Sequence, residues 1–321
     1  MRVNCFRPFT AFCGYTAGCK KWKQTGCHEC PILGRSRDGI DRCAEFFERK
    51  KTGFADLTDF VALTPSRWLN REIQAGILSR KFFHTTTPTS VRLDIFRPVQ
   101  QREALARLGI PADRPVILAG SAGLRKNKGG DALCEALRQL EGQWSGTPPR
   151  VLVFGHDAPF LAKVRDCGLE AQALGWISDF STLAYVYAAA DVFVSPSFQD
   201  NLPNTVNESL ACGTPVICFD RFSSEDVVID GVTGFLARHP GLPLSPEGHL
   251  LQPAPYEPEP ERCADLAAKI LQFFELPQWR RDLMRHECRQ LAEATFDPAL
   301  EAARYLQLFR HMLGLPYISL Y

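Results

Sequence analysis

The stretch from Val192 to Gly213 constrains the fold more than any other part of this sequence. It opens with an apolar, β-branched run, Val192–Val194, which predicts a short buried strand. A polar loop follows, and Pro203-Asn204-Thr205 then offers a helix start ahead of an apolar stripe at helical spacing. The loop and the helix start therefore lie at a strand's carboxyl end. In open α/β sheets ligands bind at this end, and a helix N-terminus suits an anionic ligand.

The same alternation of strand and helix extends on both sides of this stretch. Short apolar runs of strand length are separated by amphipathic segments of helical length, a pattern typical of a parallel, doubly wound sheet. The expected strands are 116–119, 151–154, 171–176, 192–194 and 216–219. The expected helices are 46–51, the one capped by Ser66, 131–140, 159–166, 180–190, the one after Pro203, 224–229, 262–274, 278–294 and 298–313, and the Pro-rich segment 239–260 is expected to be a loop.

Length and charge narrow the class of protein. A chain of 321 residues is long enough for two α/β domains that each bury a core. A net charge of +1 gives no basic surface from which to argue nucleic acid as a partner. No signal peptide and no apolar run near the ~20 residues of a membrane-spanning helix is recognisable, so we expect a cytoplasmic protein.

Cysteines are concentrated at the start of the chain, where little periodicity predicts a long structured loop. Of the 12 cysteines, six fall between Cys5 and Cys43. Cys27 and Cys30 form a C-x-x-C pair downstream of Cys13 and Cys19, a spacing compatible with a zinc site, with a disulfide or with free buried thiols. Reduced thiols fit a cytosolic chain better than a disulfide framework does.

Two carboxylates, Asp200 and Glu208, are separated by seven residues and flank the predicted helix start. Alone, such acids are commonly partners of the helix dipole. Together with AAADVFVSPS before them and ESLACGTPVICFD and DGVTGFLA after them, the pattern resembles the E-x7-E motif of retaining glycosyltransferases with the GT-B fold, glycosyltransferase family 4. Asp200 stands where that family usually has Glu.

The resemblance implies roles for both acids. The first would bind the hydroxyls of the donor sugar and the second the ribose of the nucleotide. A Gly-rich loop, Arg125 to Gly130, adds three cations before a predicted helix. Lys128 matches the family's Lys-Gly and would stabilise the diphosphate leaving group, with Arg125 as its partner and Lys126 as a competitor for that role. The alternative is a solvated basic loop.

Further residues are expected to contact the donor. Glycines that end strands let the backbone approach a ligand, and the loop of the two-acid motif would supply amides. Trp176 would form an apolar wall at the nucleobase or else belong to the core. His156 follows a strand, but a surface or phosphate-side role is expected rather than a catalytic one. The donor-binding set is Gly120, Gly129, Gly155, Trp176, Asn201, Leu202, Pro203, Asn204 and Thr205.

The resemblance also predicts the organisation of the chain. Pro8-Phe9-Thr10 and the Cys-rich segment resemble an internal part of the family's acceptor domain, which implies that the first strands of that domain would precede Met1. We expect an α/β, GT-B chain of two Rossmann-like doubly wound domains, the first incomplete. The predicted divisions are 1–98 on the acceptor side, 99–297 on the donor side and a terminal helix, 298–321, that crosses back to the first domain.

The expected function is a retaining glycosyltransferase that moves a sugar from a nucleotide diphosphate sugar to a glycan or lipid-linked hydroxyl. The alternatives are a nucleotide-sugar-binding remnant without turnover and, less favoured, a nucleotide-sugar epimerase. No metal and no other cofactor is expected, because no Asp-x-Asp occurs and the resemblance implies Lys and Arg where other glycosyltransferases put a divalent ion. The family's acid or base position falls on Asn4 or Cys5, neither of which suits that role. We also expect a role in polysaccharide biosynthesis, with peripheral association at the inner membrane face as one option.

Overall fold

The computed structural model describes residues 1–16, 18–30, 38–120, 128–155, 158–238 and 260–316. The described chain forms two compact units. The first unit holds Met1–Thr87 together with Gln199–Leu202. The second holds residues 88–198, 203–238 and 260–316. Each unit is described separately below.

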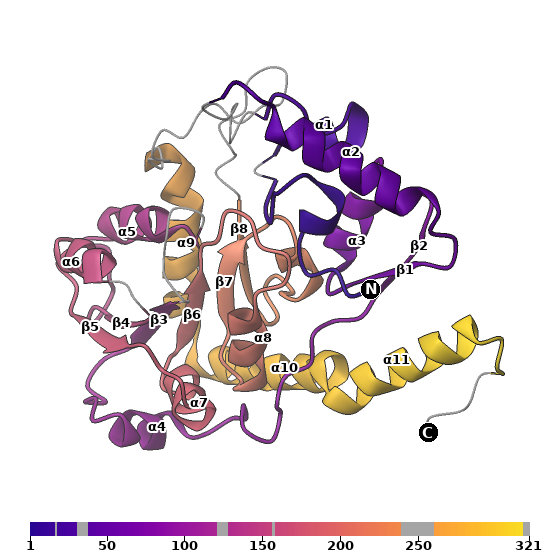
Figure 1. The fold of residues 1–321 in the computed structure, drawn as a ribbon. Coiled ribbons are helices and arrows are strands. Elements are labelled where there is room, and N and C mark those ends of the chain that lie inside the picture. Colours follow the sequence, from indigo (N-terminus) through magenta and orange to yellow (C-terminus); the bar gives the residue numbers. More distant parts are fainter. Residues whose placement is uncertain (17, 31–37, 121–127, 156–157, 239–259, 317–321) are drawn as a thin grey trace. The chain divides into compact units, whose positions relative to one another are not determined.

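A parallel sheet of six strands forms the centre of the second unit (Figure 1). Its spatial order is β5-β4-β3-β6-β7-β8, and every neighbouring pair is parallel. All residues of β3, β4, β6 and β7 are buried, as expected for strands covered on both faces. The strands are β3 (Val116–Gly120), β4 (Arg150–Phe154), β5 (Ala171–Gly175), β6 (Val192–Ser195), β7 (Val216–Phe219) and β8 (Gly234–Ala237).

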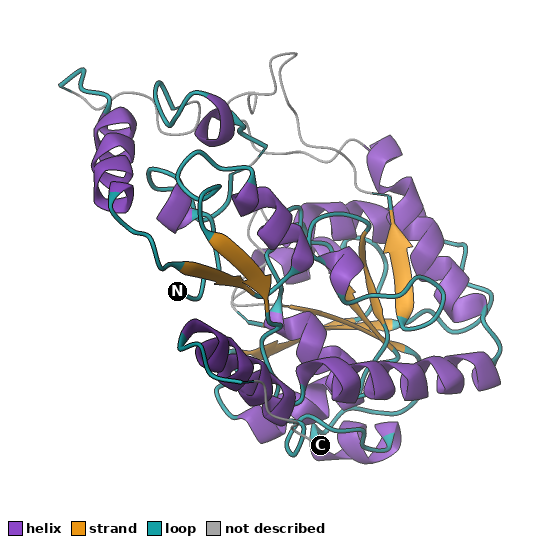
Figure 2. Cartoon of the chain, turned by 90° about the vertical axis from the view of Figure 1, so that its right-hand side faces the viewer, coloured by secondary structure: helices purple, strands orange, loops and turns teal. Residues whose placement is uncertain are grey.

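Two groups of helices accompany this sheet. One group packs through α5 against α6 and α9, and the other through α7 and α8 against α4 and α10. Figure 2 shows the strands lying side by side among these helices. The helices are α4 (Gln101–Arg107), α5 (Gly130–Gln139), α6 (Ala158–Arg165), α7 (Phe180–Ala188), α8 (Asn204–Ala211), α9 (Pro260–Glu275), α10 (Gln278–Phe296) and α11 (Pro298–Met312).

The first unit has a smaller sheet and an aromatic core. Strands β1 (Val61–Thr64) and β2 (Phe83–Thr86) pair in parallel, and Arg2 forms a parallel bridge to Leu63. The helical elements are η1 (Arg7–Phe9), α1 (Lys21–Gln24), α2 (Arg42–Ala55) and α3 (Arg67–Gln74). Their apolar faces meet in one cluster, Val3, Phe6, Phe9, Trp22, Phe47, Ala62, Leu69, Ile73, Leu78 and Phe82.

Caps explain where two helices of the first unit begin. The Asp41 carboxylate accepts from the amides of Cys43 and Ala44, so α2 starts well before the predicted start at Phe46. The Ser66 hydroxyl accepts from the Leu69 amide at 3.1 Å, which confirms the predicted cap of α3. The Cys-rich start was expected to be a long loop, yet it carries η1, α1 and part of the core.

Several expectations on elements need correction. The predicted helix 224–229 is only a 3₁₀ turn, Ser224–Asp226, because its apolar residues Val227 and Val228 are drawn into the core instead of forming a helical stripe. Strands β2 and β8 and helix α4 carry too little periodicity to be predicted. The predicted loop at 239–260 lies, up to residue 259, outside the described residues. No described helix is both long enough and apolar enough to cross a membrane.

The predicted α/β fold with a parallel, doubly wound sheet is confirmed in the second unit. The predicted domain limits of 98 and 297 and the crossing of α11 to the first domain stay predictions. The first boundary between the compact units follows Thr87, and α11 belongs to the second unit.

Candidate active site

The strand order of the second unit reverses between β3 and β6. From β3 the chain adds β4 and β5 on one side, and β6, β7 and β8 then follow on the other. At such a switch point the two connections leave in opposite directions, and ligands of doubly wound sheets bind outside the carboxyl ends of these strands. The segments leading to α5 and α8 both start there.

Two helix N-termini follow the switch-point strands. Helix α5 begins after Gly129, and α8 begins after Pro203; within the described residues, neither start has a side-chain capping hydrogen bond. Their first-turn amides and the positive ends of their dipoles favour a negatively charged ligand. Lys128 lies two residues before α5, next to its N-cap Gly129, and adds a positive charge beside the first of these helix starts.

Gly129 explains how α5 and the loop after β6 come together. Its φ is +71°, and a Cβ atom there would lie 1.8 Å from the Pro196 carbonyl oxygen. Only glycine tolerates both the left-handed backbone and this approach. The role of Gly129 at this point is therefore close backbone packing, whereas its predicted contact with the donor stays a prediction.

Glu208 lies on α8 and faces α7. Its Oε2 accepts a hydrogen bond of 2.9 Å from the hydroxyl of Tyr187, a fully buried residue near the end of α7. Burial raises the pKa of Glu208 to about 7, and the Tyr187 hydrogen bond opposes that rise. The carboxyl is consequently poised to change its charge near neutral pH.

Tyr187 was missed by sequence reasoning. It lies in an apolar helix, Phe180–Ala188, where an aromatic residue at helical spacing indicates core packing. No local pattern connects it with an acid 21 residues later in the chain. Only the packing of α7 against α8 brings the two groups together.

Asp200, Asn201 and Leu202 belong to the first unit. There the side-chain amide of Asn201 donates to the Asn4 carbonyl oxygen at 2.8 Å, and Gln199 contacts the Thr16 hydroxyl at 3.3 Å. Burial, with a smaller contribution from Asp200, raises the pKa of Tyr15 to about 12. Tyr15, which sequence reasoning did not indicate, is thus a neighbour of Asp200.

The remaining predicted donor-binding residues are distributed along the second unit. Gly120 ends β3 and Gly155 follows β4, and both have a positive φ. Trp176 follows the edge strand β5 and is 58% exposed, so its alternative assignment to the core is wrong. Pro203, Asn204 and Thr205 form the start of α8, as predicted. Arg125, Lys126 and His156 lie outside the described residues.

The cysteines of the first unit gather around a small apolar cavity. Cys13, Cys19, Cys27, Cys30 and Cys43 line it together with Trp22 and His28. Burial raises the pKa of Cys13 and Cys43 to about 12 and that of Cys27 to about 11. No disulfide joins any of the cysteines, and the described residues contain no group of three ligands arranged to hold a metal ion. Cys43 is buried, and the other four thiols are partly buried.

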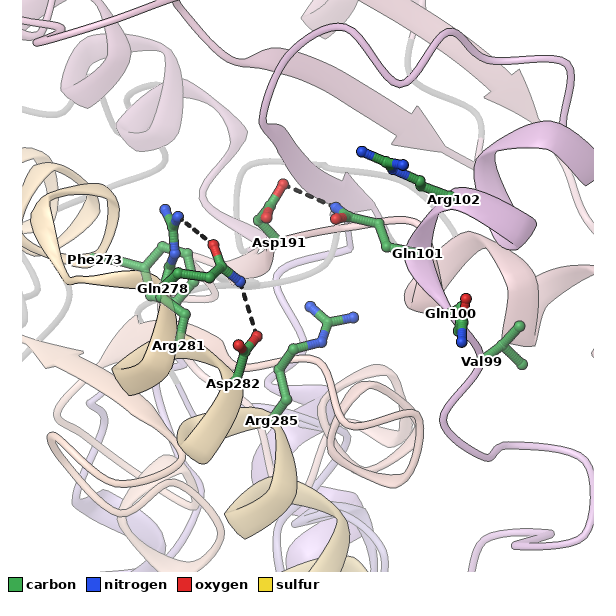
Figure 3. Close-up of a pocket in the computed structure, with 10 residues that line it drawn as sticks. All are labelled: Val99, Gln100, Gln101, Arg102, Asp191, Phe273, Gln278, Arg281, Asp282 and Arg285. Atoms are coloured by element: carbon green, nitrogen blue, oxygen red, sulfur yellow. Dashed lines mark hydrogen bonds between the residues drawn. The ribbon is translucent and has the colours of Figure 1, made fainter.

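A separate cavity of about 270 Å³ lies at the other end of the sheet, among the amino ends of β3 and β6 (Figure 3). Asp191, which directly precedes β6, accepts there from the Val116 amide at 2.8 Å and from Gln101 at 2.9 Å. Arg285 of α10 donates to the carbonyl oxygens of Ala188 and Ala190. These polar groups are used mainly to join α4, α7 and α10 to the strand ends.

Residues 114–243 match the family model described as glycosyl transferases group 1. Among curated proteins, the chain is 30% identical over 208 residues to a D-inositol 3-phosphate glycosyltransferase of Nocardiopsis dassonvillei, a match that covers 61% of this chain and 43% of the relative. The identity to the D-inositol 3-phosphate glycosyltransferase of Xylanimonas cellulosilytica is 34% over 164 residues. That match covers 46% of this chain and 38% of the relative. The matches thus span less than half of either relative.

Solved structures of low sequence identity share the fold. Sucrose-phosphate synthase from Thermosynechococcus elongatus aligns with a TM-score of 0.64 at 24% identity, covering 83% of this chain and 62% of that one. Anabaena Alr3699/HepE, solved in complex with UDP-glucose, aligns with a TM-score of 0.63 at 17% identity. The alignment covers 83% of this chain and 68% of that one. Residues 114–243 are therefore similar to the group 1 glycosyltransferases, and the chain shares its α/β fold with these solved structures.

Proposed function

We propose that this chain is a retaining glycosyltransferase that takes a sugar from a nucleotide diphosphate sugar. One observation carries the proposal: at the switch point of the second unit, two uncapped helix starts and Lys128 follow the carboxyl ends of neighbouring strands. This arrangement presents positive charge to a ligand without a metal ion. A diphosphate group is the part of such a donor that it fits.

Lys128 and the start of α5 would act on the leaving group. When the bond between the anomeric carbon and the phosphate oxygen breaks, negative charge accumulates on the departing diphosphate. Fixed positive groups aimed at that oxygen stabilise the transition state more than the ground state. Arg125 is the proposed partner of Lys128 in this role.

Glu208 would hold the nucleotide. An ionised carboxylate accepts two hydrogen bonds from vicinal hydroxyls, and the ribose presents such a pair. Among the described residues Tyr187 is the hydrogen-bond partner of this carboxylate, and it occupies Oε2. Asp200 would accept from the hydroxyls of the donor sugar, and the amides of Asn201 to Thr205 would bind sugar and phosphate.

The proposed reaction retains the configuration of the sugar. The acceptor oxygen bonds to the anomeric carbon on the face from which the diphosphate leaves, and the acceptor proton passes to the departing phosphate. No side-chain nucleophile is then needed. The acceptor is a hydroxyl on a glycan or lipid-linked molecule, which would place the chain in polysaccharide biosynthesis, in the cytoplasm or at the inner membrane face.

A second candidate function is binding of a nucleotide sugar without turnover. It is favoured by the position at which the family carries its acid or base, because Asn4 and Cys5 occupy it here. Asn4 lies beside the loop of Asp200, where its carbonyl oxygen accepts from Asn201. An amide side chain cannot exchange a proton at neutral pH, so Asn4 cannot serve as a general acid or base.

Two measurements test the proposals together. Calorimetry with UDP, GDP and ADP identifies the nucleotide, and release of that nucleotide from its sugar conjugates, with and without glycan acceptors, measures turnover. Binding with turnover supports the transferase, and binding without turnover supports the second candidate. If none of the nucleoside diphosphates binds, both are wrong.

A further inference from the structure

We propose that Tyr187 is a positioning residue that keeps Glu208 ionised and correctly oriented for nucleotide binding. The identity of the ligand, a nucleotide, rests on the proposed function. The hydrogen bond between the two side chains does not, because it is a property of the protein itself. It assigns a role to a residue of α7 that lies outside the two-acid motif and its loop.

The first step of the argument is the rigidity of Tyr187. Its ring is fully buried and packs edge-on against Phe154 at 5.8 Å and Phe193 at 5.7 Å between centroids. Its own carbonyl oxygen accepts from the Thr214 hydroxyl at 2.8 Å. Ring and backbone are thus both held, so the hydroxyl donates to Glu208 from a fixed position.

The second step concerns the proton on Tyr187. Burial, together with the neighbouring Glu208 carboxylate, raises the pKa of Tyr187 well above its usual value. The hydroxyl consequently remains protonated over the whole range in which Glu208 titrates. It acts as a constant donor, and a donor to the charged form of a carboxyl lowers the pKa of that carboxyl.

The third step concerns the charged groups around Glu208 in the described part of the chain. The cations that face α8 from α10 are Arg285 and Arg289; both lower the pKa of Cys212, and Arg289 donates to the Ala211 carbonyl oxygen at 3.0 Å. These contacts lie at the last residues of α8. Burial raises the pKa of Glu208 and the Tyr187 hydrogen bond is what opposes it.

The consequence is a pH dependence of nucleotide binding. Only the ionised carboxylate accepts from both ribose hydroxyls, so affinity should rise as the pH passes through the Glu208 pKa of about 7. Without the Tyr187 hydroxyl that pKa rises further, and a higher pH is needed for the same affinity. The phenyl ring that replaces the phenol in Tyr187→Phe would still fill the aromatic pocket.

The experiment measures the affinity for UDP, or for the nucleoside diphosphate that binds best, from pH 5.5 to 9.5. Tyr187→Phe should move the midpoint upward by about one pH unit, which makes binding about fivefold weaker at pH 7 and nearly unchanged at pH 9. Glu208→Gln reports the pH dependence of the ligand's own phosphate. Tyr185→Phe, two residues away on the same helix, is the matched control and should follow the parent protein.

A loss of affinity in Tyr187→Phe that is equal at every pH would show a merely structural role and overturn the proposal. Folding of each variant is checked by its thermal midpoint. A second measurement needs no ligand: the Glu208 carboxyl is titrated by carbon-13 NMR and assigned through Glu208→Gln. An identical carboxyl pKa with and without the Tyr187 hydroxyl overturns the inference even where no nucleotide binds, whereas a shifted pKa without binding overturns only the proposed function.

Discussion

The two ends of the six-stranded sheet show how one scaffold serves two purposes. At the amino ends of β3 and β6, Asp191, Gln101 and Arg285 satisfy backbone groups and each other around a polar cavity. At the carboxyl ends, two helices begin without side-chain caps, and Glu208 is held partly buried with a raised pKa. Satisfied polar groups stabilise a fold, whereas groups left with unused capacity bind ligands.

The cavity at the amino ends is therefore not the candidate site, although it is well formed. Its charged groups come from α4, α10 and the residue before β6, and the hydrogen bonds drawn in Figure 3 run between protein groups. The contrast predicts that substitutions at the carboxyl ends change ligand binding or rate, and that substitutions at the amino ends change stability.

The largest effect is expected for Lys128→Ala. Loss of a cation at the leaving group should lower kcat by about 100-fold or more with a smaller change in substrate affinity, because the charge it meets develops in the transition state. Release of nucleotide from the donor sugar is the measurement. Lys163→Ala removes a cation that pairs with Asp131 of α5 at the surface and should leave kcat within about twofold. An effect of Lys128→Ala confined to KM would contradict its proposed role.

Glu208→Gln should weaken binding of the nucleoside diphosphate by about 10- to 100-fold when measured at pH 8.5, where the native carboxyl is ionised. The neutral amide loses charge-assisted hydrogen bonds worth about 1.5 to 3 kcal/mol. Calorimetry gives the affinity, and Glu225→Gln, an exposed acid of the 3₁₀ turn after β7, serves as the control. Unchanged affinity would remove Glu208 from the site.

Arg285→Ala tests the opposite end of the sheet. It deletes donors to two carbonyl oxygens at the end of α7, so the free energy of unfolding should fall by about 1.5 to 3 kcal/mol while nucleotide affinity stays within about twofold. Urea unfolding and calorimetry measure the two quantities, with the exposed Arg102 changed to Ala as control. A large loss of affinity in a folded Arg285→Ala protein would break the contrast between the two ends.

Chelation should have the smallest effect. Lys128 and two helix starts supply positive charge at the switch point, so a chelator should change nucleotide affinity by less than about twofold. The affinity is compared with and without chelator and after addition of Mg²⁺ or Mn²⁺. If binding disappears with the chelator and returns with the metal, the proposed metal-free site is wrong. Elemental analysis for zinc separately tests the thiols around Cys13.

The sequence alone was enough to predict most strands and helices of the second unit. β-Branched runs such as Val192–Val194 and Val216–Phe219 are buried on both faces, and local apolar periodicity therefore identifies them. The start of α8 after Pro203 follows from the residue types at a helix terminus. The spacing of Asp200 and Glu208, together with the segments that flank them, gave the resemblance with which the match over residues 114–243 agrees.

Tertiary structure decided what no local pattern contains. Strand order placed the starts of α5 and α8 at one switch point, since pairing of β3 with β6 joins residues about 75 positions apart. Packing of α7 on α8 coupled Tyr187 to Glu208, and burial changed the acid's pKa. Trp176, by contrast, is exposed although its residue type allowed a core position. Periodicity reports which face of an element is buried, but only the fold determines which elements share that interior and which charges it isolates from water.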